Sequence, residues 1–287
     1  MRLLGLMLIA CTLSAAASPG DPAIASGAVD HALARMYNFD FPEAQRILDR
    51  HIAANPADPV AYAVRAAALL FSEFDRLMIL ESEFFTDDER IRAKTKLAPD
   101  PDVRRRLHQA AREAQNRARA VLAVRPNDRN ALFALSMATG VLTDYAGFVE
   151  KRKLASLVLA KESHGYALEL LLHHPTFYDA HLTMGLSEYL TSSLPFFVRW
   201  FVRFDQVEGS KARAVKHLEL AACSGRYLAP FAKILLAILH LREKRPWETE
   251  RLLAELARDY PENPLIRKEL GKVSKMNAHG GAARTAQ

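Results

Sequence analysis

The stretch HPTFYDAHLTMGL, residues 174–186, decides the fold, because three other segments of this 287-residue chain repeat its pattern. They are NPADPVAYAVRAA at 55–67, RPNDRNALFALSM at 125–137 and YPENPLIRKELGK at 260–272. A small residue stands ten positions after the proline of each copy: Ala66, Ser136, Gly185 and Gly271. Another stands twelve positions before each proline: Ala44, Ala114, Ser163 and Thr249. Because proline ends a helix and small side chains let two helices approach closely, the pattern predicts antiparallel helix pairs that stack in series.

The four copies resemble the tetratricopeptide repeat, in which helix pairs of about 34 residues stack into a superhelix. The resemblance covers most of residues 27–273. Phe41 stands at the aromatic turn position, Tyr62 at the aromatic position near a helix start, and Met184–Gly185 at the central pair. Three positions depart from the family pattern: Arg35, His51 and Arg65. The resemblance implies an all-α solenoid, and it says little about the ligand.

The spacing of the copies predicts two insertions. The intervals between the four prolines are 70, 49 and 86 residues, and each is longer than a whole number of units of about 34 residues. We expect the extra residues near 73–100 and 192–207, within a repeat domain of residues 27–273. The prediction is about five helix pairs and a closing helix that begins at Pro264. Residues 274–287 are expected to form a flexible tail.

The composition favours the same architecture. Hydrophobic residues make up 50% of the chain and charged residues 25%, with only 12 glycines, which is typical of a helical chain with a large core. Apolar residues recur at helical spacing, and runs of alternating β-branched residues are absent. We therefore expect no sheet.

The first seventeen residues have the features of a secretory signal peptide. A positive charge at Arg2 precedes an apolar run and a cluster of small residues that ends at Ser18. This pattern predicts that residues 1–17 are removed, that 18–26 form a linker, and that the protein is bacterial and exported, either periplasmic or secreted. The alternative is a lipoprotein, because the sequence up to Cys11 resembles a lipobox, although cleavage there leaves only ten residues of signal.

Basic residues gather in one stretch of a chain whose net charge is +6. Residues 90–125 contain eleven Arg or Lys against three acids, and such a segment could bind nucleic acid or an anionic membrane. The alternative is a solvated helix face, since Arg105, Arg112 and Arg119 recur every seven residues opposite an apolar stripe. We favour the solvated face and expect no nucleic-acid partner, because no aromatic residues interleave with the arginines to stack bases.

An aromatic segment lies inside the second insertion. It reads LPFFVRWFVRF, residues 194–204. A helix of this composition either packs against neighbouring repeats or enters a membrane interface, where Trp and Arg are both common. We expect it to pack, with these residues on it: Phe196, Phe197, Arg199, Trp200, Phe201 and Arg203. A membrane surface remains the less favoured partner. The alternative function is then a peripheral membrane protein, anchored by this helix or by a lipidated Cys11.

No motif indicates an enzyme or a cofactor. The chain has no glycine-rich phosphate loop, no H-E-x-x-H and no serine in a nucleophile elbow. His173, His174 and His181 lie close in sequence with Asp179 among them. Adjacent histidines point in different directions on a helix and the ligand set is not closed, so we expect no metal site. The sequence therefore predicts a non-enzymatic protein without a cofactor.

A concave groove is the expected binding surface of such a solenoid. The first helix of each pair should line it, and a partner protein would lie there as an extended or helical peptide. The phase of the repeats places these residues in the groove: Asn130, Phe133, Met137, Asp179, Leu182, Leu186 and Tyr189. The predicted function is an exported scaffold for protein interaction or envelope assembly.

Overall fold

The computed structural model describes residues 26–81, 98–193 and 206–285, and all the regular structure in these ranges is helical. The α-helices form five pairs and a closing helix, α14 (Pro264–Thr285). The pairs are α1 (Ser26–Tyr37) with α2 (Phe41–Ala54), α3 (Pro59–Arg76) with α6 (Pro101–Val124), α7 (Arg129–Asp144) with α8 (Lys153–His173), α9 (Ala180–Ser193) with α11 (Lys211–Ser224), and α12 (Ala229–Arg242) with α13 (Pro246–Asp259). The predicted all-α solenoid of about five pairs plus a closing helix is thus confirmed.

The proline of each copy lies in the turn between two pairs, and in three of the four copies the polar residue two positions after it caps the next helix. Asp58 accepts a hydrogen bond from the backbone N–H of Val60 at the start of α3. Asp128 caps α7 and Asn263 caps α14 in the same way. Such caps satisfy backbone donors that a helix start leaves unpaired. The repeated sequence therefore fixes where each pair ends and the next begins.

The small residues lie where helices cross closely. A Cβ atom on Gly185 of α9 would lie 2.9 Å from Cγ of Leu218 and 3.0 Å from the carbonyl oxygen of Ala214, both on α11. At the crossing of α7 and α8, the Ser163 hydroxyl donates to the carbonyl oxygen of Ser136 over 2.8 Å. Gly271 differs, because no atom approaches the place of its Cβ within 4 Å. It lies on α14, the last helix of the described chain.

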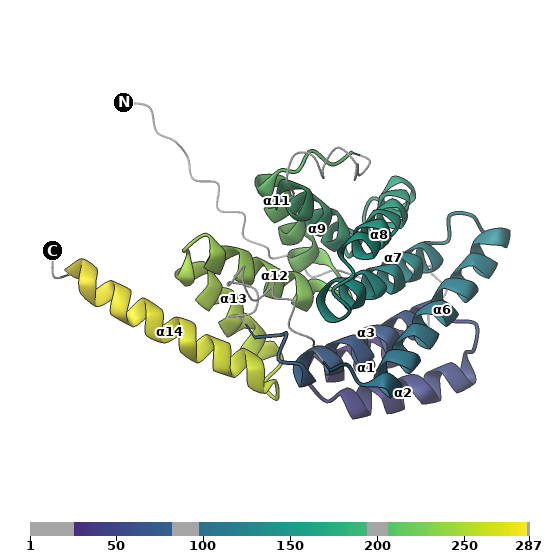
Figure 1. The fold of residues 1–287 in the computed structure, drawn as a ribbon, viewed down its shortest axis with the longest axis horizontal. Coiled ribbons are helices and arrows are strands. Elements are labelled where there is room, and N and C mark those ends of the chain that lie inside the picture. The colour runs from purple at the N-terminus through teal and green to yellow at the C-terminus, as the bar shows by residue number, and fades with distance from the viewer. Residues whose placement is uncertain (1–25, 82–97, 194–205, 286–287) are drawn as a thin grey trace.

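The superhelix curls until its last pair contacts its first. The segment before α12 and the turn between α13 and α14 contact α1, and α14 extends away from that turn (Figure 1). The Tyr37 hydroxyl at the end of α1 donates to the carbonyl oxygen of Tyr227 over 3.0 Å, and the Asn263 side chain donates to the carbonyl oxygen of Tyr37 over 2.8 Å. Arg35 also forms an ion pair with Glu262, with 2.8 Å between nitrogen and oxygen. These contacts close the array on itself.

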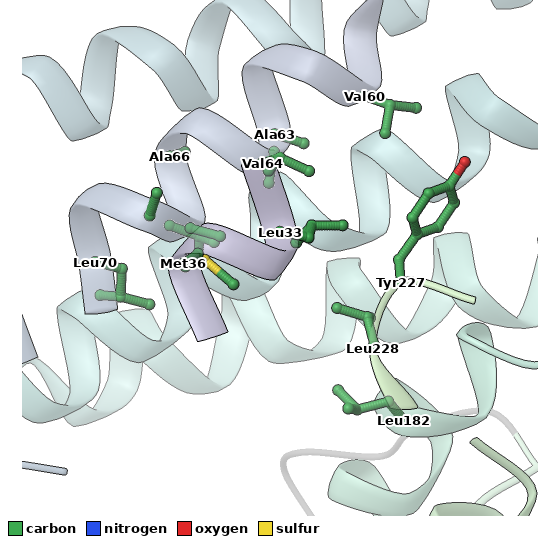
Figure 2. Packing of buried hydrophobic residues seen from close by; sticks show 14 of the residues in the cluster. Leu33, Met36, Val60, Ala63, Val64, Ala66, Leu70, Leu182, Tyr227 and Leu228 are labelled. Atoms are coloured by element: carbon green, nitrogen blue, oxygen red, sulfur yellow. The ribbon is translucent and has the colours of Figure 1, made fainter. Parts of the chain in front are cut away.

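One continuous apolar core runs through the array and across the closure. Leu33 of α1 belongs to the same cluster as Val60 of α3 and Leu182 of α9. Figure 2 shows Tyr227 beside Val60, and Leu228 next to Leu182, so the segment before α12 inserts into the middle of the solenoid. The core therefore occupies the space that an open superhelix would leave as a groove.

The C-terminal boundary differs from the sequence-based expectation. Residues 274–287 were expected to form a flexible tail after Val273, but α14 continues to Thr285. Two polar contacts extend the packing of α14 on α13: the Ser274 hydroxyl and the Asn277 amide both donate to the carboxylate of Glu250. The residues of the two predicted insertions that lie at 82–97 and 194–205 fall outside the described ranges.

Candidate functional site

The structure brings together three of the seven predicted groove residues and buries them. Phe133 of α7 is 2% exposed, and Asp179 and Leu182 are also buried. The ring of Phe133 stacks on that of Tyr227, with 5.3 Å between the centroids. The other four predicted residues are only half-buried: Asn130, Met137, Leu186 and Tyr189. The concave face is therefore filled by the chain's own residues where the sequence predicted an open groove, because the closure brings the segment before α12 onto it.

Asp179 holds that segment in place. Its carboxylate accepts hydrogen bonds from the backbone N–H groups of Arg226, Tyr227 and Leu228 over 3.0, 2.8 and 2.7 Å. Burial raises the pKa of Asp179, and the three backbone donors act in the opposite direction. Asp179 thus ties the start of α9 to the start of α12, which is a structural role where the sequence predicted a peptide contact.

An open groove lies at the start of α6. It has a volume of about 550 Å³ and is lined by two prolines and four basic side chains: Pro99, Pro101, Arg104, Arg105, His108 and Arg112. We call this the α6 groove. Arg104, Arg105 and Arg112 are exposed. This part of α6 is therefore a solvated basic helix face, as the sequence predicted. The face is concave where it forms the groove.

A buried acid and its arginine fix the turn that begins α6. Glu73 of α3 is 1% exposed, and the guanidinium of Arg76 donates to both of its carboxylate oxygens over 2.8 Å. Glu73 also accepts the backbone N–H of Asp100, while Arg76 donates to the carbonyl oxygen of Ala98. Paired charges of this kind are costly to separate once buried. They hold the prolines of the α6 groove in a defined position.

A π-helix, Tyr145–Val149, packs against His108, one of the residues that line the groove. The Tyr145 ring is fully buried and meets the ring of His108 edge to face, with 5.5 Å between the centroids. Burial, reinforced by the negative charge of Glu73, raises the pKa of Tyr145 to about 12. Burial also lowers the pKa of His108. Just after the π-helix, Glu150 pairs with Arg104 over 2.8 Å, so two lining residues of the groove, His108 and Arg104, are each held by a residue at or next to the π-helix.

A histidine pair joins α9 to α11. The Nδ1 atoms of His181 and His217 are 2.8 Å apart, while their ring centroids are 5.0 Å apart. The two nitrogens therefore lie nearly on the line between the rings, so one ring donates its N–H to the other. Burial, with His217 as the second cause, lowers the pKa of His181 to about 4, and burial lowers that of His217. This neutral pair links two helices by a hydrogen bond.

The described residues give no cluster for a metal ion. No group of three or more His, Cys, Asp and Glu side chains in these ranges could hold one. His173 and His174 lie at the end of α8, and the His174 ring contacts the carbonyl oxygen of Asn127 over 2.7 Å. His181 instead faces His217, so the histidines that are close in sequence do not converge.

Several predicted features lie outside the described residues. These are the signal peptide at 1–17 with Cys11, and the aromatic helix with Phe196, Phe197, Arg199, Trp200, Phe201 and Arg203. One described segment, Arg129–Val149, is long and apolar enough to cross a membrane, with a mean hydropathy of 1.4. Within the solenoid 61% of it is buried, and the core helix of a soluble protein passes the same test. The segment is therefore weak evidence for a membrane span.

Sequence reasoning missed the residues beneath the α6 groove and the partner of His181. The excess of basic residues before position 125 marked the right helix, but the π-helix that places Tyr145 under it has no signal in the repeat pattern. His217 lies on the next helix, 36 residues from His181, so no local spacing links the two.

Comparison of the chain with protein-family models, with curated proteins and with solved structures finds no match.

Proposed function

We propose that this protein is a non-enzymatic, tetratricopeptide-like scaffold that binds an acidic segment of a partner protein in the α6 groove. The observation that carries the proposal is the groove itself, since it combines a concave shape with three arginines on one helix. The proposal includes export from a bacterial cell, which rests on the sequence of residues 1–17. It replaces the concave face as the binding surface, because that face is filled by Tyr227 and Leu228.

The charges of the groove support an acidic ligand. Arg105 has 70% of its side chain exposed, and its partner Asp102 is itself more than half exposed. Such surface pairs contribute little and exchange easily. No carboxylate among the described residues forms an ion pair with Arg112. Arginine suits carboxylate ligands because its planar group can donate two parallel hydrogen bonds.

The rigid base of the groove supports selective binding. Glu73 and Arg76 fix the turn with Pro99 and Pro101, so the groove keeps its shape without a ligand. A preformed site loses less conformational entropy on binding than a flexible one. Both oxygens of the buried Glu73 accept hydrogen bonds from the chain, which supports a structural role for this acid beside the groove.

The test is fluorescence anisotropy of a labelled peptide of alternating Glu and Ala, titrated with the protein at low and at physiological salt. We expect Arg105→Glu/Arg112→Glu to weaken binding by at least about tenfold, which corresponds to about 1.4 kcal/mol. The matched control is Arg258→Glu/Arg267→Glu on α13 and α14, which changes the net charge equally and should alter binding by less than about twofold.

Three outcomes would contradict the proposal. The first is an acidic peptide that fails to bind even at about millimolar protein, where a specific site should be detectable. The second is an equal loss in the α6 variant and in the control, which would indicate attraction to net charge alone. The third is competition by single-stranded DNA at least as strong as that by unlabelled peptide, because the preferred ligand would then be a nucleic acid.

A further inference from the structure

The basic side chains that line the α6 groove follow one line along the helix. Arg104, His108 and Arg112 are spaced four residues apart, and all three line the groove. Residues at this spacing lie on the same face of a helix. A rise of 1.5 Å per residue places Arg112 about 12 Å from Arg104 along the helix axis. The α6 wall of the groove therefore has an arginine at each end.

A further arginine joins the Arg104 end from outside α6. Arg152 immediately precedes α8, and it donates to one carboxylate oxygen of Glu150 over 3.2 Å. Arg104 pairs with the other oxygen of Glu150 over 2.8 Å. Burial lowers the pKa of His108, and the charge of Arg152 lowers it further, as the charges of the arginines at the two ends of the wall do. Arg152 therefore lies beside the groove, although the residues that line the groove do not include it.

The positive charge of this surface is concentrated at two points. At one end, the two guanidinium groups share the single carboxylate of Glu150, so one positive charge remains. At the other end, Arg112 forms no ion pair with a carboxylate of the described residues. Between them, His108 is neutral at neutral pH, and Asp102 offsets the charge of Arg105. A ligand with two separated acidic groups is complementary to this distribution.

The dimensions of the groove favour an extended ligand. In an extended chain, side chains four positions apart point to the same side and lie about 13 Å apart, which matches the separation of about 12 Å between the arginines of the wall. A helix needs eight residues for the same span. With its side chains, a helix about 12 Å long occupies about 900 to 1,400 Å³, whereas the volume of the groove is about 550 Å³. A helical ligand is therefore too wide for this groove.

We propose that the partner segment lies extended along α6 and carries two acidic residues four positions apart, one bound by Arg112 and the other by Arg104 with Arg152. This inference rests on the proposed function, because it specifies the ligand of the same groove. Arginine can donate two parallel hydrogen bonds to a carboxylate. Because arginine has five N–H donors, Arg104 and Arg152 keep donors for the ligand while they pair with Glu150.

Competition against the labelled peptide of alternating Glu and Ala tests the spacing. The competitors are unlabelled Gly-Ser peptides of equal length, each with two Glu residues that stand two, four or six positions apart. Gly-Ser chains are flexible, so these peptides differ in the spacing of their charges and not in net charge. We expect the four-position peptide to compete at a concentration at least about threefold lower than the other two, because a linker that matches the span of two sites binds best.

Replacing Arg152 by alanine tests the arginine outside α6. Arg152→Ala should weaken the four-position peptide by at least about threefold and reduce its advantage over the two-position peptide, because Glu150 then neutralises Arg104 alone. The matched control is Arg46→Ala on α2. It removes an arginine of similar exposure that also pairs with a glutamate, and it should change binding by less than about 1.5-fold. Circular dichroism should show the same helix content for both variants.

The outcomes distinguish this inference from the proposed function. If the labelled peptide binds and Arg105→Glu/Arg112→Glu weakens it, but the three spacings compete equally, the inference is wrong and the proposed function stands. The same conclusion follows if Arg152→Ala has no more effect than Arg46→Ala. A helical peptide with acidic residues eight positions apart that competes better than the four-position peptide would overturn the extended ligand. If the labelled peptide does not bind, both the inference and the proposed function are wrong.

Discussion

Replacing Asp179 by alanine should loosen the contact between the two ends of the solenoid. The carboxylate accepts three backbone hydrogen bonds of 2.7 to 3.0 Å from the segment before α12. That segment carries Tyr227, whose carbonyl oxygen accepts the hydroxyl proton of Tyr37 on α1. Asp179→Ala removes all three acceptor contacts and leaves buried N–H groups without partners. Asp179 is therefore one of the contacts that hold the closure, together with the Asn263 and Arg35 contacts to the turn before α14.

The expected cost follows from the number and burial of these bonds. A hydrogen bond to a charged group contributes about 1.5 to 3 kcal/mol. The burial that raises the pKa of Asp179 opposes part of this gain, so we expect a net loss of about 3 kcal/mol in the free energy of unfolding. For a chain of this size, 1 kcal/mol corresponds to about 2 to 4 °C in Tm. The variant should thus melt about 6 to 12 °C lower than the wild type.

Calorimetry measures the change in Tm, and amide hydrogen exchange locates it. The N–H groups of Arg226, Tyr227 and Leu228 should lose protection in Asp179→Ala before the amides of α7 do, because local opening exposes them first. Asp179→Asn keeps one carbonyl oxygen as acceptor and should lose less. The matched control is Asp49→Ala, which removes an exposed carboxylate and its surface ion pair and should cost less than about 1 kcal/mol.

Two results would contradict the role of Asp179 in the closure. If Asp179→Ala lowers Tm no more than Asp49→Ala does, the three hydrogen bonds do not hold the closure. If the variant loses stability but the amides of residues 226–228 remain as protected as in the wild type, the lost stability arises elsewhere. Either result would leave the filled concave face without its physical explanation.

Three further predictions follow from single contacts. Gly185→Leu should cost at least about 1 to 3 kcal/mol in urea unfolding, through overpacking, whereas Gly165→Leu on the outer face should not. Lowering the pH from 7.5 to 4.5 should reduce the free energy of unfolding by about 2 kcal/mol through His181. The folded pKa of His181 is about 4, whereas the unfolded chain takes up this proton near 6.5, so stability is full above pH 6.5 and is lost toward pH 4. His217→Gln should reduce this loss. Tyr145→Phe should raise stability by up to about 1 kcal/mol, because the buried hydroxyl has no hydrogen-bond partner among the described residues.

The repeat architecture was predictable because it is encoded locally. A proline, a small residue twelve positions before it and a small residue ten positions after it lie within two consecutive helices and their turn, so their spacing alone places Ala114, Pro126 and Ser136. Ala44, Ala114, Ser163 and Thr249 are buried as close contacts between helices require. These features need no knowledge of how one pair sits on the next.

The filled groove was not predictable by the same means. The curvature of a solenoid is the sum of small rotations at each pair, so the meeting of Tyr37 with Tyr227, 190 residues later, depends on every unit between them. Phe133, Asp179 and Leu182 were predicted to contact a peptide, but they are buried, and no pattern in the sequence indicates that the array returns onto them. The same holds for His181 and His217, which meet only because α9 and α11 cross at Gly185.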